Sequence, residues 1–316
     1  MTASTRTSRL DARRGRGRAY RWRRTALLAV VLAVAALVVP DPSLRSTPAS
    51  LVKVDRADGV DHDRRMVWVL VLGSDARPGD PPWRSRADAI QMVGLNLETG
   101  RGVMIGVPRD SYVPIPGRGS DKINAAMTYG GPPLMARAVG DLVGVRPDYV
   151  FTTTFEGLQS MVYTAGGVVV QSRFDITDPK MPGHVRQGRN RLDAREALFF
   201  SRARYALPRG DFDRSANQQA LLRGTLATVR SRLDRPGFFE RGVLSVLRNT
   251  NTDLSPVELY RLARAVTKVR PDRLRGCVIG GSFGTAGGAS IVIPDVSTAR
   301  RLGNEARNDG TFERGC

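Results

Sequence analysis

The sequence predicts an α/β fold in which helices flank a mixed central β-sheet. Segments with strand and helix periodicity alternate along residues 66–316. The continuous apolar run MVWVLVLG (66–73) is typical of a strand buried on both faces. A turn at 98–100 joins two further apolar segments, 89–96 and 102–107, into an antiparallel hairpin, so the sheet should contain both strand directions.

The segments that follow continue the alternation. Helices are expected at 132–144, at 155–167 and at the C-terminus, and strands at 148–155, 167–172, near Val278 and at 291–295. The glycine-rich stretch 280–288 lacks the spacing and the lysine of a P-loop, and we interpret it as a turn or a flexible edge. We therefore expect one α/β domain over residues 66–316.

The first 65 residues predict a membrane anchor and a linker. Residues 1–24 hold nine arginines against one acid, and residues 25–39 carry no charge. Arginines ahead of an apolar run place the N-terminus in the cytoplasm and the domain outside it. No small-x-small cleavage site follows Val39, so the sequence favours a transmembrane signal anchor at 25–40 over a cleaved signal peptide. The polar residues 41–65 are expected to be a linker.

Composition narrows the class of protein. Part of the net charge of +19 comes from the arginine-rich tail, where positive charge sets the orientation of the chain in the membrane. The outer domain lacks the interleaved aromatic and basic residues of a nucleic-acid surface. We therefore expect no nucleic-acid partner. His62 and His184 are isolated, which argues against zinc or histidine catalysis. Cys277 and Cys316 could form a disulfide outside the cell or remain two free thiols.

An arginine-rich stretch, SRARYALPRGDFDRSANQQ (201–219), stands at the centre of the prediction. Asp193 and Glu196 form a capping-box pattern at the start of the helix before it. After the break at 208–210, Asp211 is expected to be the N-cap of a second helix. Asp211, Arg214 and Gln218 would then share one helix face.

These residues suggest phosphate chemistry. Guanidinium groups bind phosphate oxygens in a bidentate manner, and helix N-termini attract anions. Asp75, at the end of the apolar strand, and Asp88 offer hard oxygen ligands for a divalent cation. Together they describe a metal-assisted phosphoryl-transfer site. The alternative for each residue is structural: a solvated basic helix, a turn aspartate or a local ion pair.

Six motifs occur in one order between residues 67 and 223: VLVLGSDAR, RSRADAI, VPRDSYVPIPG, KINAAMTYGG, SRAR and GDFDRSANQQ. In these motifs the chain resembles the LytR-CpsA-Psr family of cell-wall glycopolymer ligases. The resemblance implies transfer of a glycopolymer from a polyprenyl-pyrophosphate carrier to peptidoglycan, outside the cytoplasmic membrane.

The resemblance also implies roles for individual residues. Asp75 and Asp88 fall on the metal position, for Mg2+ or Mn2+. The pyrophosphate-binding positions are Arg86, Arg109, Lys122, Arg202, Arg204, Arg214 and Gln218, and the residues expected to carry catalysis are Asp75, Arg109, Arg202, Arg204 and Asp211. Family members often have an arginine where Asn217 stands here, so no role is carried over to Asn217.

Two other functions fit the same sequence. A lipid-pyrophosphate hydrolase would use the same site with water as the acceptor. A membrane-anchored regulator or wall-binding protein would use the basic face to hold an anionic polymer without turnover. The apolar faces of ALLRGTLATV (220–229) and LMARAV (134–139) could line a groove for the lipid or could be ordinary core. The sequence identifies neither the polymer nor a general base.

Overall fold

The computed structural model describes residues 49–62, 65–77 and 80–316. The expected cytoplasmic tail and signal anchor, 1–24 and 25–40, lie outside these ranges. Within them, no helix is long and apolar enough to cross a membrane. All described residues belong to one unit, which extends over residues 46–316.

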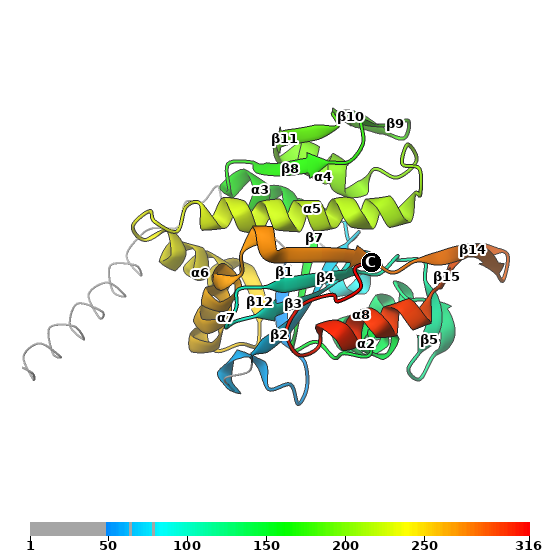
Figure 1. The fold of residues 1–316 in the computed structure, drawn as a ribbon, viewed down its shortest axis with the longest axis horizontal. Coiled ribbons are helices and arrows are strands. Elements are labelled where there is room, and N and C mark those ends of the chain that lie inside the picture. The colour runs from blue at the N-terminus through cyan, green and yellow to red at the C-terminus, as the bar shows by residue number, and fades with distance from the viewer. Residues whose placement is uncertain (1–48, 63–64, 78–79) are drawn as a thin grey trace, which may run out of the picture. The chain divides into compact units, whose positions relative to one another are not determined.

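A mixed β-sheet forms the centre of this unit, as the sequence predicts (Figure 1). Within the described ranges it has seven strands, in the order β12-β1-β7-β2-β3-β4-β13. The pairs β1-β12, β2-β7 and β4-β13 are parallel, and the other neighbours are antiparallel. The strands are β1 (Ala49–Lys53), β2 (Met66–Ser74), β3 (Ala87–Asn96), β4 (Gly102–Gly106), β7 (Tyr149–Thr154), β12 (Thr250–Thr252) and β13 (Leu274–Val278).

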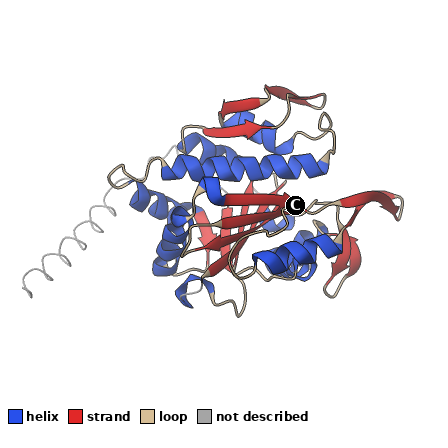
Figure 2. Cartoon of the chain, viewed as in Figure 1, coloured by secondary structure: helices blue, strands red, loops and turns tan. Residues whose placement is uncertain are grey.

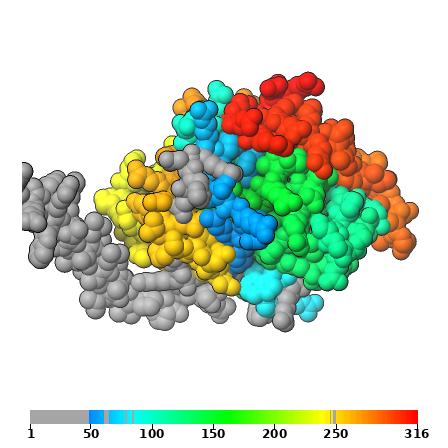
Figure 3. All heavy atoms as spheres, turned by 90° about the horizontal axis from the view of Figure 1, so that it is seen from below, coloured from blue at the N-terminus to red at the C-terminus, as the bar shows by residue number. Residues whose placement is uncertain are grey.

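Helices cover both faces of the sheet (Figure 2). Alternate residues of β2 point to opposite faces. Trp68, Leu70 and Leu72 pack in one core with α2 (Ala125–Val143) and α8 (Val296–Ala306), whereas Val67 and Val69 pack in another with α7 (Pro256–Lys268). The helix α5 (Asp211–Arg230) lies on this second side, against β3 and β4, and α6 (Phe238–Asn249) contacts α7. In the space-filling view of Figure 3, α8, in red, lies beside the green surface of α2.

A smaller module packs on the far side of α5 (Figure 1). It contains α3 (Phe155–Thr164), α4 (Ala194–Arg202) and two small sheets, β8 (Val168–Ser172) with β11 (Gly188–Leu192) and β9 (Ile176–Asp178) with β10 (Met181–Val185). Its core includes Phe200 of α4, and Leu221 of α5 packs into the same core. At Gly224 of α5, an added Cβ would lie 2.3 Å from the carbonyl oxygen of Val169, so the helix can approach β8 this closely only at a glycine. The expected strand 167–172 is thus β8, which pairs with β11 in a separate sheet and is not part of the central sheet.

Two other expectations about the fold are wrong. The linker expected at 41–65 contains β1, which pairs with β7 from Ala49 to Lys53, and the 3-10 helix η1 (Gly59–His62). The glycine-rich stretch 280–288 contains strand β14 (Gly281–Ala286), which forms a hairpin with β15 (Ala289–Pro294). The two strands escaped notice for different reasons: β1 is short and pairs with a distant strand, and β14 is itself rich in glycine, so neither has a clear local hydrophobic pattern.

The remaining elements complete the chain. They are the hairpin β5 (Tyr112–Ile115) with β6 (Gly119–Lys122) and the 3-10 helices η2 (Pro82–Arg84) and η3 (Pro271–Arg273). Cys277 of β13 forms a disulfide with Cys316, with the Cα atoms 5.3 Å apart. This bond holds the C-terminus against the central sheet and decides between the two alternatives that the sequence left open.

Candidate active site

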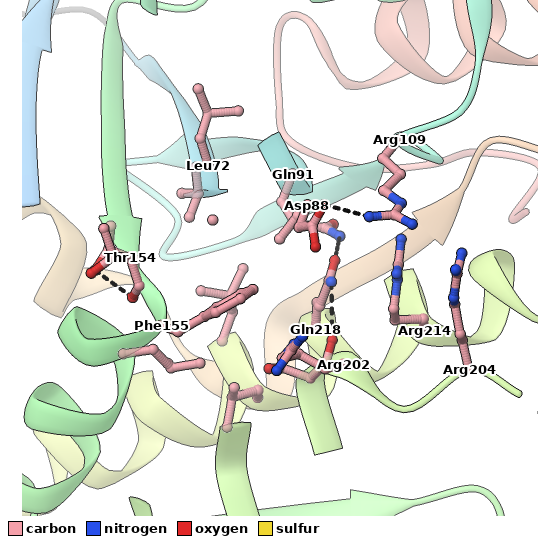
Figure 4. Close-up of a pocket in the computed structure, with 18 of the residues that line it drawn as sticks. Leu72, Asp88, Gln91, Arg109, Thr154, Phe155, Arg202, Arg204, Arg214 and Gln218 are labelled. Carbon is pink, nitrogen blue, oxygen red and sulfur yellow. Dashed lines mark hydrogen bonds and ion pairs between the residues drawn. The ribbon is translucent and has the colours of Figure 1, made fainter. Parts of the chain in front are cut away.

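Two cavities meet above the carboxyl ends of β2 and β7, and three residues line both: Arg109, Arg204 and Tyr205. The first, about 330 Å³, is here called the apolar cavity; its apolar lining includes Val71, Leu72, Phe155, Leu158, Met181, Leu221 and Leu222. The second, about 480 Å³, is the polar cavity; it is lined by Asp75, Arg86, Asp110, Lys122, Asn124 and Asp211, among others. Figure 4 shows the apolar cavity, with arginine side chains gathered at one end.

Asp211 holds the centre of the arginine cluster. The structure places Gly210, not Asp211, at the N-cap of α5, with Asp211 in the first turn. Its carboxylate is therefore free to face three guanidinium groups, at 3.2 Å from Arg204, 3.3 Å from Arg214 and 3.8 Å from Arg109. Burial would raise the pKa of Asp211, but the three arginines outweigh it and hold the pKa below its ordinary value. Asp211 is therefore charged and pairs with all three cations.

Arg109 joins the two cavities and has an unused donor. Its guanidinium lies 2.5 Å from Asp88 and its Nε 3.7 Å from Asp110. Burial would lower the pKa of Arg109, but the carboxylate of Asp88 raises it above the ordinary value. The buried Nε–H has no hydrogen-bond acceptor among the described residues. A buried unpaired donor costs about 1–3 kcal/mol, and a phosphate oxygen would remove this cost.

Arg214 contributes a fully buried cation to the cluster. Only 5% of its surface is exposed, and burial lowers its pKa although Asp211 acts in the opposite direction. In Figure 4 its guanidinium lies beside those of Arg109 and Arg204. One buried and two half-buried guanidiniums that share one carboxylate make a site with excess positive charge, which suits a polyanion.

Gln218 takes part in a buried hydrogen-bond network that the sequence does not reveal. Its amide nitrogen donates to the carbonyl oxygen of Ser201, and its Oε1 accepts from Gln91 at 3.3 Å. Gln91 also donates to Ser215 and accepts from Gln219. This network joins β3, α4 and α5 below the arginines. Gln91 is only 1% exposed, and it is a polar residue inside an apolar strand. That position is the one local signal in the sequence that could have indicated this hydrogen-bond network.

The other predicted residues surround this centre. Arg202 lies over the ring of Phe155, 4.4 Å from its centroid, at the wall of the apolar cavity. Lys122 pairs with Asp110 at 3.1 Å, and Arg86 lines the polar cavity with an exposed side chain. The structure thus brings all the predicted phosphate-binding residues to the walls of the two cavities.

Asp178 and Tyr205 support Arg204, and the sequence did not single out either. The Asp178 carboxylate accepts the backbone N–H groups of Arg204 and Tyr205, at 3.0 and 3.2 Å. Burial opposes ionisation, but a hydrogen bond from the backbone N–H of Lys180, together with these two, holds the pKa of Asp178 below its ordinary value. The Tyr205 hydroxyl accepts from Arg204 at 2.9 Å, and Lys180 lies over its ring. Asp178 is 26 residues from Arg204 in sequence, so no local pattern connects them.

The predicted metal ligands lie on different cavities. Asp88 lines the apolar cavity and Asp75 the polar one. Oδ1 of Asp75 accepts from Ser85 and from the backbone N–H of Arg86, while Oδ1 of Asp88 accepts from Arg109. No group of three or more histidine, cysteine or acidic side chains suited to a metal occurs in the described part of the chain. Any cation here would need further oxygens from water or phosphate, which is the usual arrangement for Mg2+.

The profile of the LytR_cpsA_psr family matches residues 43–308. The chain belongs to this family. This confirms the resemblance that the six motifs indicated. The fold is also that of LytR-CpsA-Psr proteins: the structure of TagT bound to LI-WTA is 25% identical, with a TM-score of 0.63 over 78% of this chain and 90% of that one. A Streptococcus agalactiae protein, gbs0355, is 22% identical, with a TM-score of 0.68 over 83% of this chain and 94% of that one.

Curated relatives are transferases. A polyisoprenyl-teichoic acid–peptidoglycan teichoic acid transferase, TagU, of Bacillus anthracis is 30% identical over 200 residues, 63% of this chain and 64% of that protein. TagU of Bacillus subtilis is 34% identical over 160 residues, half of each chain. The chain thus spans slightly less than two thirds of the length of the first of these relatives.

Proposed function

We propose that this LytR-CpsA-Psr protein transfers a glycopolymer from a polyprenyl-pyrophosphate carrier to peptidoglycan. The observation that carries the proposal is the meeting of an apolar and a polar cavity at Arg109 and Arg204. A lipid-linked pyrophosphate has groups in the matching order: an apolar chain for the apolar cavity, a pyrophosphate for the arginines and a saccharide for the polar cavity. The teichoic acid transferase names of the relatives support the same reaction class.

The apolar cavity would take the part of the carrier next to the pyrophosphate. Leu158 of α3 and Leu221 and Leu222 of α5 line it on one side, and Val71 and Leu72 of β2 line it on the other. Burying polyprenyl carbon here removes apolar surface from water, at roughly 25 cal/mol per Å². Of the two helix segments that could serve this role, 220–229 contributes Leu221 and Leu222 to the cavity wall, whereas Leu134 and Met135 of 134–139 are buried in the core between α2 and the central sheet.

The arginine cluster would bind the pyrophosphate and stabilise the charge that develops during transfer. The Nε–H of Arg109 makes no hydrogen bond, although the carboxylates of Asp110 and Asp211 lie 3.7 and 3.8 Å from it, and Arg204 offers a partly exposed guanidinium at the shared wall. Preorganised donors of this kind contribute about 10²–10³-fold to the rate of group transfer when each is removed singly. Asp211 would keep the three guanidiniums together.

Mg2+, or Mn2+, would be held by Asp75 and Asp88 together with phosphate and water oxygens. Oδ1 of each carboxylate carries the hydrogen bonds from the described residues, so Oδ2 of each is available to a cation. When bound, such an ion supplies Lewis-acid neutralisation of phosphate charge. The chain's own contribution is to place Asp75 directly after β2 and Asp88 at the start of β3, the strand paired with β2.

The reaction proposed is a displacement at phosphorus. An acceptor hydroxyl oxygen attacks the phosphorus that carries the glycopolymer, and the bond from this phosphorus to the bridging oxygen breaks. The products are a phosphodiester on peptidoglycan and a polyprenyl phosphate, which keeps the electron pair of the broken bond. The hydroxyl proton passes to a base or to water. An N-terminal signal anchor would keep the domain on the outer side of the cytoplasmic membrane, where both substrates occur.

A reconstituted assay tests this function. The full chain in detergent is given a polyprenyl-pyrophosphate-linked saccharide, Mg2+ and a peptidoglycan oligomer, and both phosphate cleavage and saccharide transfer are measured. Arg204→Ala and Asp75→Ala should lower transfer at least about 100-fold. Arg209→Ala is the matched control, because Arg209 lies in the same stretch but pairs with Asp213 outside both cavities.

The outcomes separate the three functions. Metal-dependent transfer that both site variants lose and the control retains supports the transferase. Cleavage that is equally fast with and without peptidoglycan identifies a hydrolase. Lipid binding without turnover identifies a binding or regulatory protein and refutes the proposal.

A further inference from the structure

The hairpin β14–β15 forms one wall of the polar cavity, and none of its residues has a role in the proposed binding of the donor or of the cation. Phe283 from β14 and Ser290, Ile291 and Val292 from β15 line the cavity. The hairpin is held at its base, where the Val292 N–H donates to the Asp110 carbonyl oxygen and Ser111 pairs with Val292. Beyond this base it extends away from the central sheet (Figure 1). Its residues line the polar cavity, and none of residues 281–294 lines the apolar cavity.

Phe283 is an exposed aromatic ring at the edge of this polar cavity. Its residue surface is 65% exposed, and its ring contacts the edge of Phe212, with centroids 5.7 Å apart and planes at 70°. Phe212 follows Asp211 directly in α5, so the contact holds the ring of Phe283 beside the arginine cluster. An aromatic residue with one ring contact and a largely open surface has room for a ligand.

A buried acceptor in the same cavity lacks a donor. Asn124 is 2% exposed and lines the polar cavity, and its Oδ1 accepts no hydrogen bond within the described part of the chain. Buried polar atoms are nearly always paired, so an unpaired one at a cavity wall indicates a missing ligand or water. A hydroxyl or an amide N–H group would pair with it.

These two features together describe a saccharide subsite. The C–H groups on one face of a pyranose carry partial positive charge and pack on the negative face of an aromatic ring, while the hydroxyl groups at the edge of the sugar seek hydrogen bonds. Asp110 and Lys122, on the same cavity, add further polar partners. A volume of about 480 Å³ lies in the usual range for small-ligand sites, about 300–1,000 Å³.

We propose that Phe283 and Asn124 form the acceptor subsite, where an N-acetylhexosamine ring of the peptidoglycan glycan stacks on Phe283 and donates a hydrogen bond to Asn124. This inference rests on the proposed function and names where its acceptor binds. The donor enters from the apolar cavity, so the polar cavity beyond the arginines is the side from which an acceptor hydroxyl reaches the phosphorus. Phe283 is in this sense a positioning residue for the acceptor.

The hairpin supplies its own control. Phe283 pairs with Val292 and Ser282 with Ile293, so Phe283 and Ile293 point to opposite faces. Ile293 is 53% exposed and does not line the polar cavity. Phe283→Ala and Ile293→Ala therefore remove similarly exposed apolar side chains from one hairpin, and only the first removes the stacking face. Phe283→Trp keeps an aromatic face and adds a fluorescent reporter at the site.

The first test is binding without a donor, so it needs no turnover. Chitotetraose, a soluble chain of N-acetylglucosamine, is titrated into the full chain in detergent by calorimetry, and into Phe283→Trp by fluorescence. We expect Phe283→Ala to weaken binding roughly tenfold, Ile293→Ala to leave it unchanged, and Phe283→Trp to bind and change its emission. Absence of binding to the unsubstituted chain, or equal binding by Phe283→Ala, overturns the inference.

The second test distinguishes the acceptor from the saccharide of the donor. In the transfer assay, Phe283→Ala should raise KM for the peptidoglycan oligomer and leave KM for the lipid-linked donor unchanged. A rise in the donor KM alone would assign the ring to the donor saccharide and refute the acceptor subsite. If the chain shows no turnover but binds chitotetraose through Phe283, the proposed transferase fails while the saccharide subsite stands.

Discussion

Replacing Asp211 with asparagine tests the central electrostatic argument, because asparagine has the same shape but no charge. Asp211 is 7% exposed and faces Arg109, Arg204 and Arg214. The substitution leaves these three guanidiniums without their shared carboxylate. Asp88 remains as a counter-charge at Arg109. We expect the variant to have a lower free energy of unfolding than the unsubstituted chain, and we expect a bound anion to restore part of that stability.

The magnitude follows from the distances. At separations of 3.2–3.8 Å and an effective dielectric constant of about 20, each unit-charge pair attracts by roughly 4–5 kcal/mol. The desolvation of the carboxylate offsets much of this sum. Loss of one partner from a buried ion pair usually costs about 3–5 kcal/mol, and we expect a loss in this range for Asp211→Asn. Domain stabilities are about 5–15 kcal/mol, so the variant should still fold.

The assay is chemical unfolding of the full chain in detergent, followed by tryptophan fluorescence at several pH values and with or without inorganic pyrophosphate. The pKa of Asp211 is lowered in the folded state, so its stabilisation is complete above the unfolded-state pKa, about 3.9, and is lost as pH falls through the lower folded-state value. The difference between the two proteins should therefore narrow below about pH 4. Pyrophosphate should stabilise the variant more than the unsubstituted chain.

Two results would refute this reasoning. Equal stability of the two proteins at neutral pH would mean that the arginines do not depend on Asp211. A difference that stays constant down to pH 3 would mean that the effect of the substitution is not carried by the carboxylate charge.

Two further substitutions test the apolar cavity and the disulfide. Leu158→Asp places a charge at the apolar wall, and should raise KM for a long-chain carrier at least about tenfold without changing pyrophosphate binding. Equal weakening of both ligands, measured by titration, would contradict a separate lipid cavity. Cys316→Ser opens a link between residues 39 apart, and should lower the free energy of unfolding by about 3–4 kcal/mol in denaturant titrations. An unchanged unfolding midpoint under oxidising conditions would show that the tethered C-terminus adds no stability.

Local patterns were sufficient for much of the fold. The apolar run 66–73 is strand β2, the turn at 98–100 joins β3 to β4, and the capping box of Asp193 and Glu196 opens α4. Each depends on residues a few positions apart, where side-chain periodicity and capping bonds act directly. Most arginines and aspartates of the candidate site also stand out in the sequence, at strand ends and helix starts, whereas Arg86 and Lys122 were included only through the resemblance to the family.

What only the tertiary structure decided comes from contacts between distant segments. β1 has no distinctive pattern and becomes a strand by pairing with β7, about 100 residues further along the chain, where Leu51 lies opposite Phe151. Asp211 lies in the first turn of α5 and not at its cap, and its carboxylate meets Arg109 and Arg204, which come from other segments of the chain. The apolar and polar cavities meet at the arginines only once α5 lies between the sheet and the smaller module. Periodicity indicates which face of an element is buried, but it does not indicate which other element covers that face. The candidate site depends on which elements pack against one another, and only the tertiary structure gives that.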